Sequence, residues 1–191
     1  MMSRSLLFLS LLALLATAAL AAGPGTAAAD APGAIPLQDL GLFPRDRLSV
    51  EINLAGPLLA MVAAATRQED PEFAAVMANL KAIHVQVFPL KGITGIEPLR
   101  ERIDRATRWL EDRGWTSTVR VREKGEETCI YVKESGGQIV GLTVLSLQPG
   151  DEAALINIVG RLDPAQLGRL GSRLDIPQLK NVQAQRPGDR P

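Results

Sequence analysis

Hydrophobic and polar residues alternate in several short stretches between residues 48 and 159, a pattern typical of β-strands with one buried face. In the first stretch Val50, Ile52 and Leu54 alternate with polar residues. The same pattern predicts strands at 83–87, 116–122, 128–133, 138–147 and 154–159. Gly136-Gly137 separates two of these strands and is typical of a hairpin turn. The sequence therefore predicts a sheet whose second half consists of hairpins.

Two helices are predicted between the first two strands. Pro57 begins the first, because proline has no amide hydrogen and the first helical position needs none. Asp70-Pro71-Glu72 begins the second, since an aspartate caps free amides and a glutamate favours the positive end of the helix dipole. The second helix is expected to run to about Leu80.

A third helix is predicted from Glu97 to Gly114. Its buried stripe is expected to be Leu99, Ile103, Ala106 and Leu110. Asp163-Pro164 begins a short last helix that should end near Gly171, which gives the order βααβαββββα. This order predicts a single two-layer α+β domain, with a mostly antiparallel sheet and the helices packed on one face.

Both faces of residues 140–147 are apolar, which bears on what covers the sheet. Either helices cover both faces of this strand or a second chain covers one of them. A homodimer is therefore an alternative that the pattern leaves open.

The first residues have the three parts of a secretory signal peptide: Arg4, an apolar run at 6–20, and small residues before position 22. We expect cleavage after Ala21, export to the periplasm or beyond, and no stable membrane span afterwards; an uncleaved anchor is the alternative. Residues 22–39 are rich in Ala, Gly and Pro and are expected to be flexible, and residues 178–191 to be disordered. The α+β domain is expected to comprise residues 40–177.

Composition excludes some classes of function. The 191 residues include 21 Lys and Arg and 21 Asp and Glu, so no net positive charge favours nucleic acid. Apolar residues make up 46% and charged residues 22%, which is typical of a globular protein. With one cysteine, the chain has no intrachain disulfide.

The segment 141–171 carries distinctive motifs: Leu-Ile-Asn-Ile-Val-Gly at 155–160, and Asp163-Pro164 followed by Gln166-Leu167-Gly168. With 50–52 and 83–88, it resembles an exported bacterial family known as domain of unknown function 4252. The resemblance implies an exported protein but brings no established activity, cofactor or catalytic residue. The family is associated with gene neighbourhoods of extracytoplasmic-function sigma factors and their anti-sigma partners, which implies envelope sensing or stress signalling.

Candidate catalytic residues are few. His84 is the single histidine, which excludes a His-x-x-x-His zinc helix, and it lies mid-strand as a surface or partly packed residue. Cys129 also lies in a strand, with no second thiol and no adjacent basic residue, so a small buried residue is favoured over a reactive thiol. No metal or cofactor is expected.

Three further residues are weak candidates for a structural or binding role. Arg102 and Arg105 belong to an arginine-rich helix that could bind anionic lipid, although expected ion pairs of Arg105 with Glu101 and of Arg108 with Asp104 favour an ordinary solvated face. Asn157 shares a strand face with apolar residues, so it is expected to fix the loop before Asp163 or, alternatively, to line a small site.

These observations predict a non-catalytic periplasmic interaction module whose partner is another envelope protein. The alternative is a periplasmic carrier that binds a small ligand or lipid on the apolar sheet face. No residue set supports an enzyme.

Overall fold

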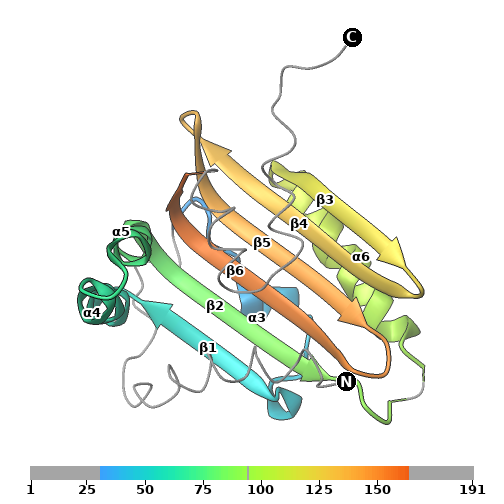
Figure 1. The fold of residues 1–191 in the computed structure, drawn as a ribbon. Coiled ribbons are helices and arrows are strands. Elements are labelled where there is room, and N and C mark those ends of the chain that lie inside the picture. The colour runs from blue at the N-terminus through green and yellow to red at the C-terminus, as the bar shows by residue number, and fades with distance from the viewer. Residues whose placement is uncertain (1–30, 94, 164–191) are drawn as a thin grey trace.

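The computed structural model describes residues 31–93 and 95–163, which form a six-stranded sheet in the order β1-β2-β6-β5-β4-β3 (Figure 1). The strands are β1 (Val50–Ala55), β2 (Leu80–Pro89), β3 (Trp115–Glu123), β4 (Glu126–Ser135), β5 (Gln138–Gln148) and β6 (Glu152–Leu162). All neighbouring strands are antiparallel. The prediction of an α+β domain with an antiparallel sheet is thus confirmed.

The helical elements are α3 (Leu37–Leu40), the 3-10 turn η2 (Arg45–Arg47), α4 (Pro57–Thr66), α5 (Pro71–Asn79) and α6 (Glu97–Asp112). Three helices, α4, α5 and α6, begin where the sequence predicts them, whereas the short α3 and η2 were not predicted. Asp70 caps α5, because its Oδ1 accepts a hydrogen bond of 3.0 Å from the amide of Phe73. All four residues of the predicted stripe on α6 are buried.

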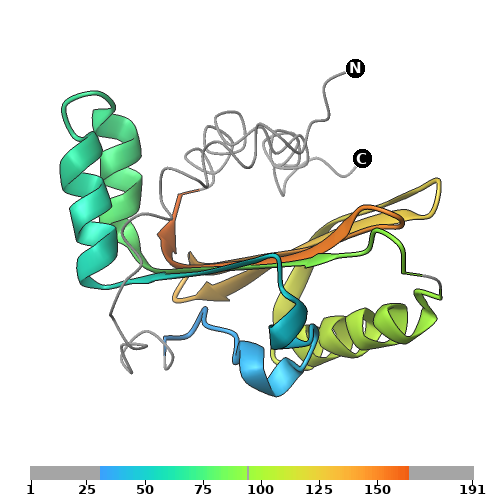
Figure 2. The ribbon, with the colours of Figure 1, turned by 90° about the horizontal axis from the view of Figure 1, so that it is seen from below.

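The helices lie on opposite faces of the sheet, so the expectation that they share one face is wrong. Figure 2 shows α6 on one side, here called the α6 face, and α4 with α5 at one end of the other, the α4–α5 face. Each face has its own core: Leu99 and Ile103 of α6 pack in one cluster, and Leu59 of α4 and Met77 of α5 in the other. The physical reason is that the central strands are apolar on both sides. Helices on both faces therefore remove apolar side chains from water.

The segment 31–36 packs on the α6 face, although the whole of 22–39 is expected to be flexible. Ile35 is only 5% exposed. Gly33 lies so close to β5 that a Cβ there would be 2.0 Å from the carbonyl oxygen of Val140. Only glycine allows such an approach, and an Ala/Gly/Pro-rich composition does not reveal that a segment has a sheet to pack on.

Several predicted features lie outside the described residues: the signal peptide, the rest of the segment before residue 31, the last helix after Asp163 and the C-terminal tail. Within residues 31–93 and 95–163, no helix is long and apolar enough to cross a membrane.

Candidate functional site

A row of polar side chains crosses the α6 face from β1 to β4. Strand pairing places these residues opposite one another in turn: Asn53, His84, Asn157, Thr143 and Tyr131. Side chains of directly paired residues point to the same face of a sheet. This row is therefore the first candidate for a catalytic or binding site.

Asn157 lies at the centre of this row and is fully buried. Its amide nitrogen donates to Thr143 Oγ1 at 3.1 Å and to the carbonyl oxygen of Gly33 at 3.1 Å. It also lies 3.3 Å from the carbonyl oxygen of Leu142. Its Oδ1 accepts a hydrogen bond of 3.3 Å from the amide of Ile35. Asn157 thus fixes the segment 33–35 rather than the loop before Asp163, and its polar atoms are occupied instead of facing a ligand.

His84 is half-buried next to the edge strand. Its Nδ1 lies 2.8 Å from Asn53 Oδ1, which can only accept, so Nδ1 carries the proton. Burial lowers the pKa of the imidazole. Burial thus favours the neutral imidazole, and its side-chain hydrogen bond is to an amide rather than to a nucleophile.

A second polar cluster links α6 to the row. The Tyr131 hydroxyl accepts from Arg120 at 2.7 Å and donates to Glu111 Oε1 at 3.0 Å. Arg120 and Glu111 also form an ion pair of 3.6 Å. This cluster connects β3, β4 and the last turn of α6, and no local sequence pattern indicates it because its members lie on three separate elements.

Cys129 is completely buried beside this cluster. Its thiol donates to Glu127 Oε1 at 3.5 Å, and Glu127 lies in β4 and pairs with Arg122 at 2.7 Å. Burial raises the pKa of the thiol to about 11, although nearby Arg120 and Arg122 lower it. Cys129 therefore has arginine neighbours that the sequence did not reveal, and it is still protonated at neutral pH and unsuited as a nucleophile.

The arginines of α6 do not form the helical ion pairs expected for them. Among the described residues, neither Arg105 nor Arg108 has an ion-pair partner. Arg100 instead donates to the carbonyl oxygen of Gly125 at 2.9 Å. Arg105 is exposed, whereas Arg102 is half-buried and lines a cavity at the start of α6.

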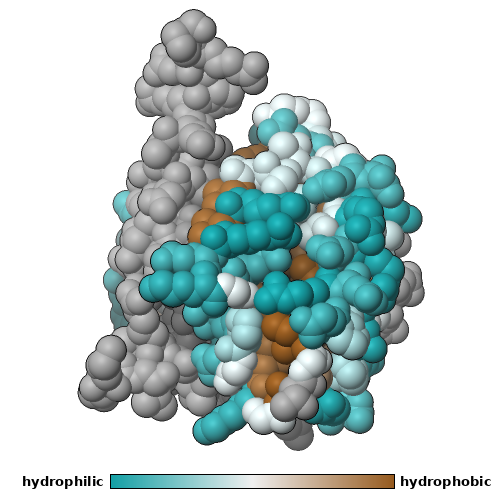
Figure 3. Space-filling view, turned by 90° about the vertical axis from the view of Figure 1, so that its right-hand side faces the viewer, coloured by the Kyte–Doolittle hydropathy of each residue, from teal (hydrophilic) through white to brown (hydrophobic). Residues whose placement is uncertain are grey.

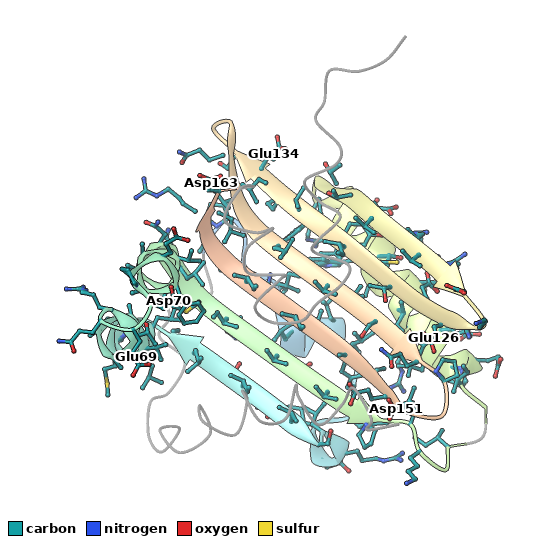
Figure 4. The ribbon with its side chains drawn as sticks, in the orientation of Figure 1. Glu69, Asp70, Glu126, Glu134, Asp151 and Asp163 are labelled. Carbon is teal, nitrogen blue, oxygen red and sulfur yellow. The ribbon has the colours of Figure 1, made fainter. Side chains whose placement is uncertain are left out.

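Acidic residues lie at both ends of the sheet. Figure 4 shows Glu126 and Asp151 at one end of the sheet and Glu134 and Asp163 at the other. Within the described part of the chain, no three His, Cys, Asp or Glu side chains are grouped to hold a metal ion. The described residues therefore show no candidate metal centre.

The α4–α5 face differs, because two of its rows consist of apolar side chains on β1, β2 and β6. We define the open patch as Val50, Ile52, Val85, Val87, Ala154 and Ile156. These residues are half-buried and occupy neighbouring positions on β1, β2 and β6. Val50, Val85, Val87 and Ala154 belong to no core cluster, and no described helix lies over them (Figure 2).

The fold and these arrangements define an α+β protein whose buried polar groups hold its own segments together and whose second sheet face carries an apolar patch. The chain belongs to the family described as Domain of unknown function (DUF4252), whose model matches residues 46–170. The resemblance seen in the sequence is thereby confirmed. No curated protein matches the chain.

Proposed function

We propose that this protein is a non-catalytic interaction module of the bacterial envelope, exported through the signal peptide at residues 1–21. The observation that carries the proposal is the open patch on the α4–α5 face. The buried polar groups of the α6 face also support the proposal. Their hydrogen bonds are made within the protein, which indicates structural rather than catalytic roles.

The open patch is suited to hold an apolar partner surface. Pairing places Val50 opposite Val87, and Val85 between Ile52 and Ile156, so two apolar rows run across three strands. None of these side chains is charged. Contiguous apolar surface of this kind marks interaction sites on soluble proteins.

The partner we propose is an amphipathic helix of another envelope protein. Rows of side chains on neighbouring strands lie about 4.8 Å apart, and the apolar stripe of a helix can lie across such rows. α4 and α5 border the face at one end, which gives the patch a wall on that side (Figure 2). The family's association with sigma factors and anti-sigma factors supports a partner in envelope stress signalling.

Site-specific photo-crosslinking in living cells tests this proposal. A photoreactive residue at Val85 is expected to give an adduct with a different envelope protein. The same residue at Arg108, which is exposed on α6, serves as the matched control and should give no such adduct. Adducts only with residues 164–191 of the same chain, or only with a second copy, would reject the proposal, since either would show that the protein covers its own patch.

The second candidate function is a carrier of a small ligand or lipid on the same face. The uncharged character of the open patch favours it, because acyl chains need contact without charge. Mass spectrometry of organic extracts distinguishes the two: a lipid that copurifies with the native protein, and is lost from a variant with Val85→Thr, supports the carrier.

A further inference from the structure

A cavity of about 170 Å³ lies on the α6 face, away from the open patch. It forms where the end of β2, the turn η2 and the first turn of α6 meet. Its lining residues are Pro44, Arg47, Phe88, Leu90, Ile93, Gly95, Ile96, Pro98, Leu99 and Arg102. All but two of these are uncharged, so the cavity is an apolar site with two guanidinium groups.

The apolar part of this cavity is firmly built. Phe88, Leu90 and Leu99 are core residues that are at most 9% exposed. The ring of Phe88 stacks on that of Phe43 with centroids 5.6 Å apart and an interplanar angle of 4°. Core packing of this kind fixes the base of the cavity.

Arg47 is held next to the base of the cavity. Its guanidinium carbon lies 5.2 Å from the centroid of the Phe88 ring, within the range of a cation–π contact. Such a contact restrains the side chain but leaves its N–H donors free to bind another group. The neighbouring Arg45 differs, because it is paired with Glu51 at 2.9 Å.

Neither guanidinium of the cavity is neutralised by a direct ion pair. Among the described residues, the ion pairs involve other basic side chains, and Asp46 and Glu97, which adjoin the lining residues in sequence, pair with neither Arg47 nor Arg102. Guanidinium groups bind carboxylates through charge-assisted, often bidentate hydrogen bonds. The chemistry of the cavity thus fits a ligand with an apolar body and one carboxylate.

The surface on this side of the molecule agrees with a small apolar site among polar groups. Figure 3 shows brown hydrophobic surface low on the side that carries β3 and α6, framed by teal hydrophilic side chains. A cavity of about 150 Å³ lined by Leu, Ile and Phe accommodates benzene, so the volume here fits a ring or a short branched chain.

We propose that this cavity reversibly binds a small monocarboxylic acid with an apolar body about the size of a benzene ring. The body lies against Ile93, Ile96 and Leu99, and the carboxylate accepts hydrogen bonds from Arg47 and Arg102. The site does not depend on the open patch, which lies on the opposite face of the sheet. The protein would thus bind a small molecule at a site separate from the one proposed for its protein partner.

An NMR titration of the purified protein with three probes tests the proposal. Phenylacetate combines ring and charge, 2-phenylethanol keeps the ring, and acetate keeps the charge. Phenylacetate should shift the resonances of Phe88, Ile93 and Ile96 saturably with a Kd of about 1 mM or tighter. 2-Phenylethanol should bind about tenfold more weakly, and acetate should not saturate.

Variants of the two arginines test whether these side chains bind the carboxylate. Arg47→Met and Arg102→Met should each weaken phenylacetate binding about fivefold and leave 2-phenylethanol binding unchanged, because they remove the charge but keep apolar bulk. Arg108→Met, on the exposed surface of α6, is the matched control and should change neither. Equal affinity for phenylacetate and 2-phenylethanol, or no saturable shift near the cavity, would overturn the proposal.

Discussion

The α6 face and the α4–α5 face are built from alternate residues of the same six strands, yet they differ in how their side chains interact. On the α6 face Asn157 is 0% exposed and hydrogen-bonded to β5 and to the segment 33–35. On the α4–α5 face Val85 is half-buried, and its paired neighbours Ile52 and Ile156 are both apolar. Within the described residues, no buried side-chain nitrogen or oxygen lacks a partner.

The difference follows from the directionality of the two kinds of interaction. Hydrogen bonds fix both distance and angle, so the polar row specifies where the segment 33–35 and the end of α6 must lie. Apolar contact is not directional and tolerates any partner of suitable shape. The polar groups of the α6 face thus stabilise the internal structure of the protein. The α4–α5 face has apolar surface to which another molecule can bind.

The largest effect is expected from Asn157→Leu on the α6 face. Leucine leaves the buried amide of Ile35 and the carbonyl of Gly33 without partners, which should lower the free energy of unfolding by about 3 kcal/mol. Urea denaturation measures the change, and hydrogen exchange of the Ile35 amide should become fast. Ser146→Ala, a half-buried polar residue of β5 on the other face, is the control and should change stability by less than about 0.5 kcal/mol. Equal effects of the two substitutions would remove the contrast between the faces.

A smaller, pH-dependent effect is expected from His84. Burial lowers its pKa in the folded protein below the ordinary value of 6.5, so the unfolded chain binds more protons in the window just below that pH. Stability should therefore fall as the pH is lowered from 6.5 through the folded pKa. In His84→Gln this part of the pH dependence should disappear, which thermal unfolding at a series of pH values would reveal. A variant whose stability follows the wild-type pH curve would contradict the prediction, because it would show that the pKa of His84 is the same in the folded and unfolded chains.

The smallest effect on stability, and a large one on binding, is expected from Val87→Thr in the open patch. The substitution conserves shape and should change the free energy of unfolding by less than about 0.5 kcal/mol. A buried hydroxyl without a partner should weaken the complex with the envelope protein about tenfold. Affinity is measured with the partner identified by crosslinking, and Arg108→Gln on α6 should leave it unchanged. Unaltered binding by Val87→Thr would place the interface elsewhere.

The elements of this fold could be predicted from local patterns, because each depends on residues close in sequence. Period-two alternation predicted the strands, and Asp70-Pro71 and Glu97-Pro98 marked helix starts. The assignment of helices to faces could not be predicted, since the strand 140–147 is apolar on both sides and distinguishes neither. The α4–α5 pair therefore lies on the face opposite α6, where the sequence suggested a single helical layer.

The polar groups were harder to interpret, because their partners are distant in sequence. Asn157 was recognised as a buried amide, but the residues it holds lie 122 and 124 positions earlier. Arg120 reaches Cys129 only through the β3–β4 pairing, whose register shifts between Ser117 and Val119. Arg102 was a candidate because of its charge, but no local pattern indicated the cavity beside it.

The account rests on the claim that the open patch is accessible to other molecules in the free protein. Paramagnetic broadening by a soluble nitroxide or gadolinium probe measures this directly from the methyl resonances. The account predicts that Val85 and Val87 are broadened strongly, while Leu145, which faces α6 from the middle of the same sheet, is protected. Protection of Val85 and Val87 equal to that of Leu145, even at low protein concentration, would contradict it by showing that the chain itself already occupies this face.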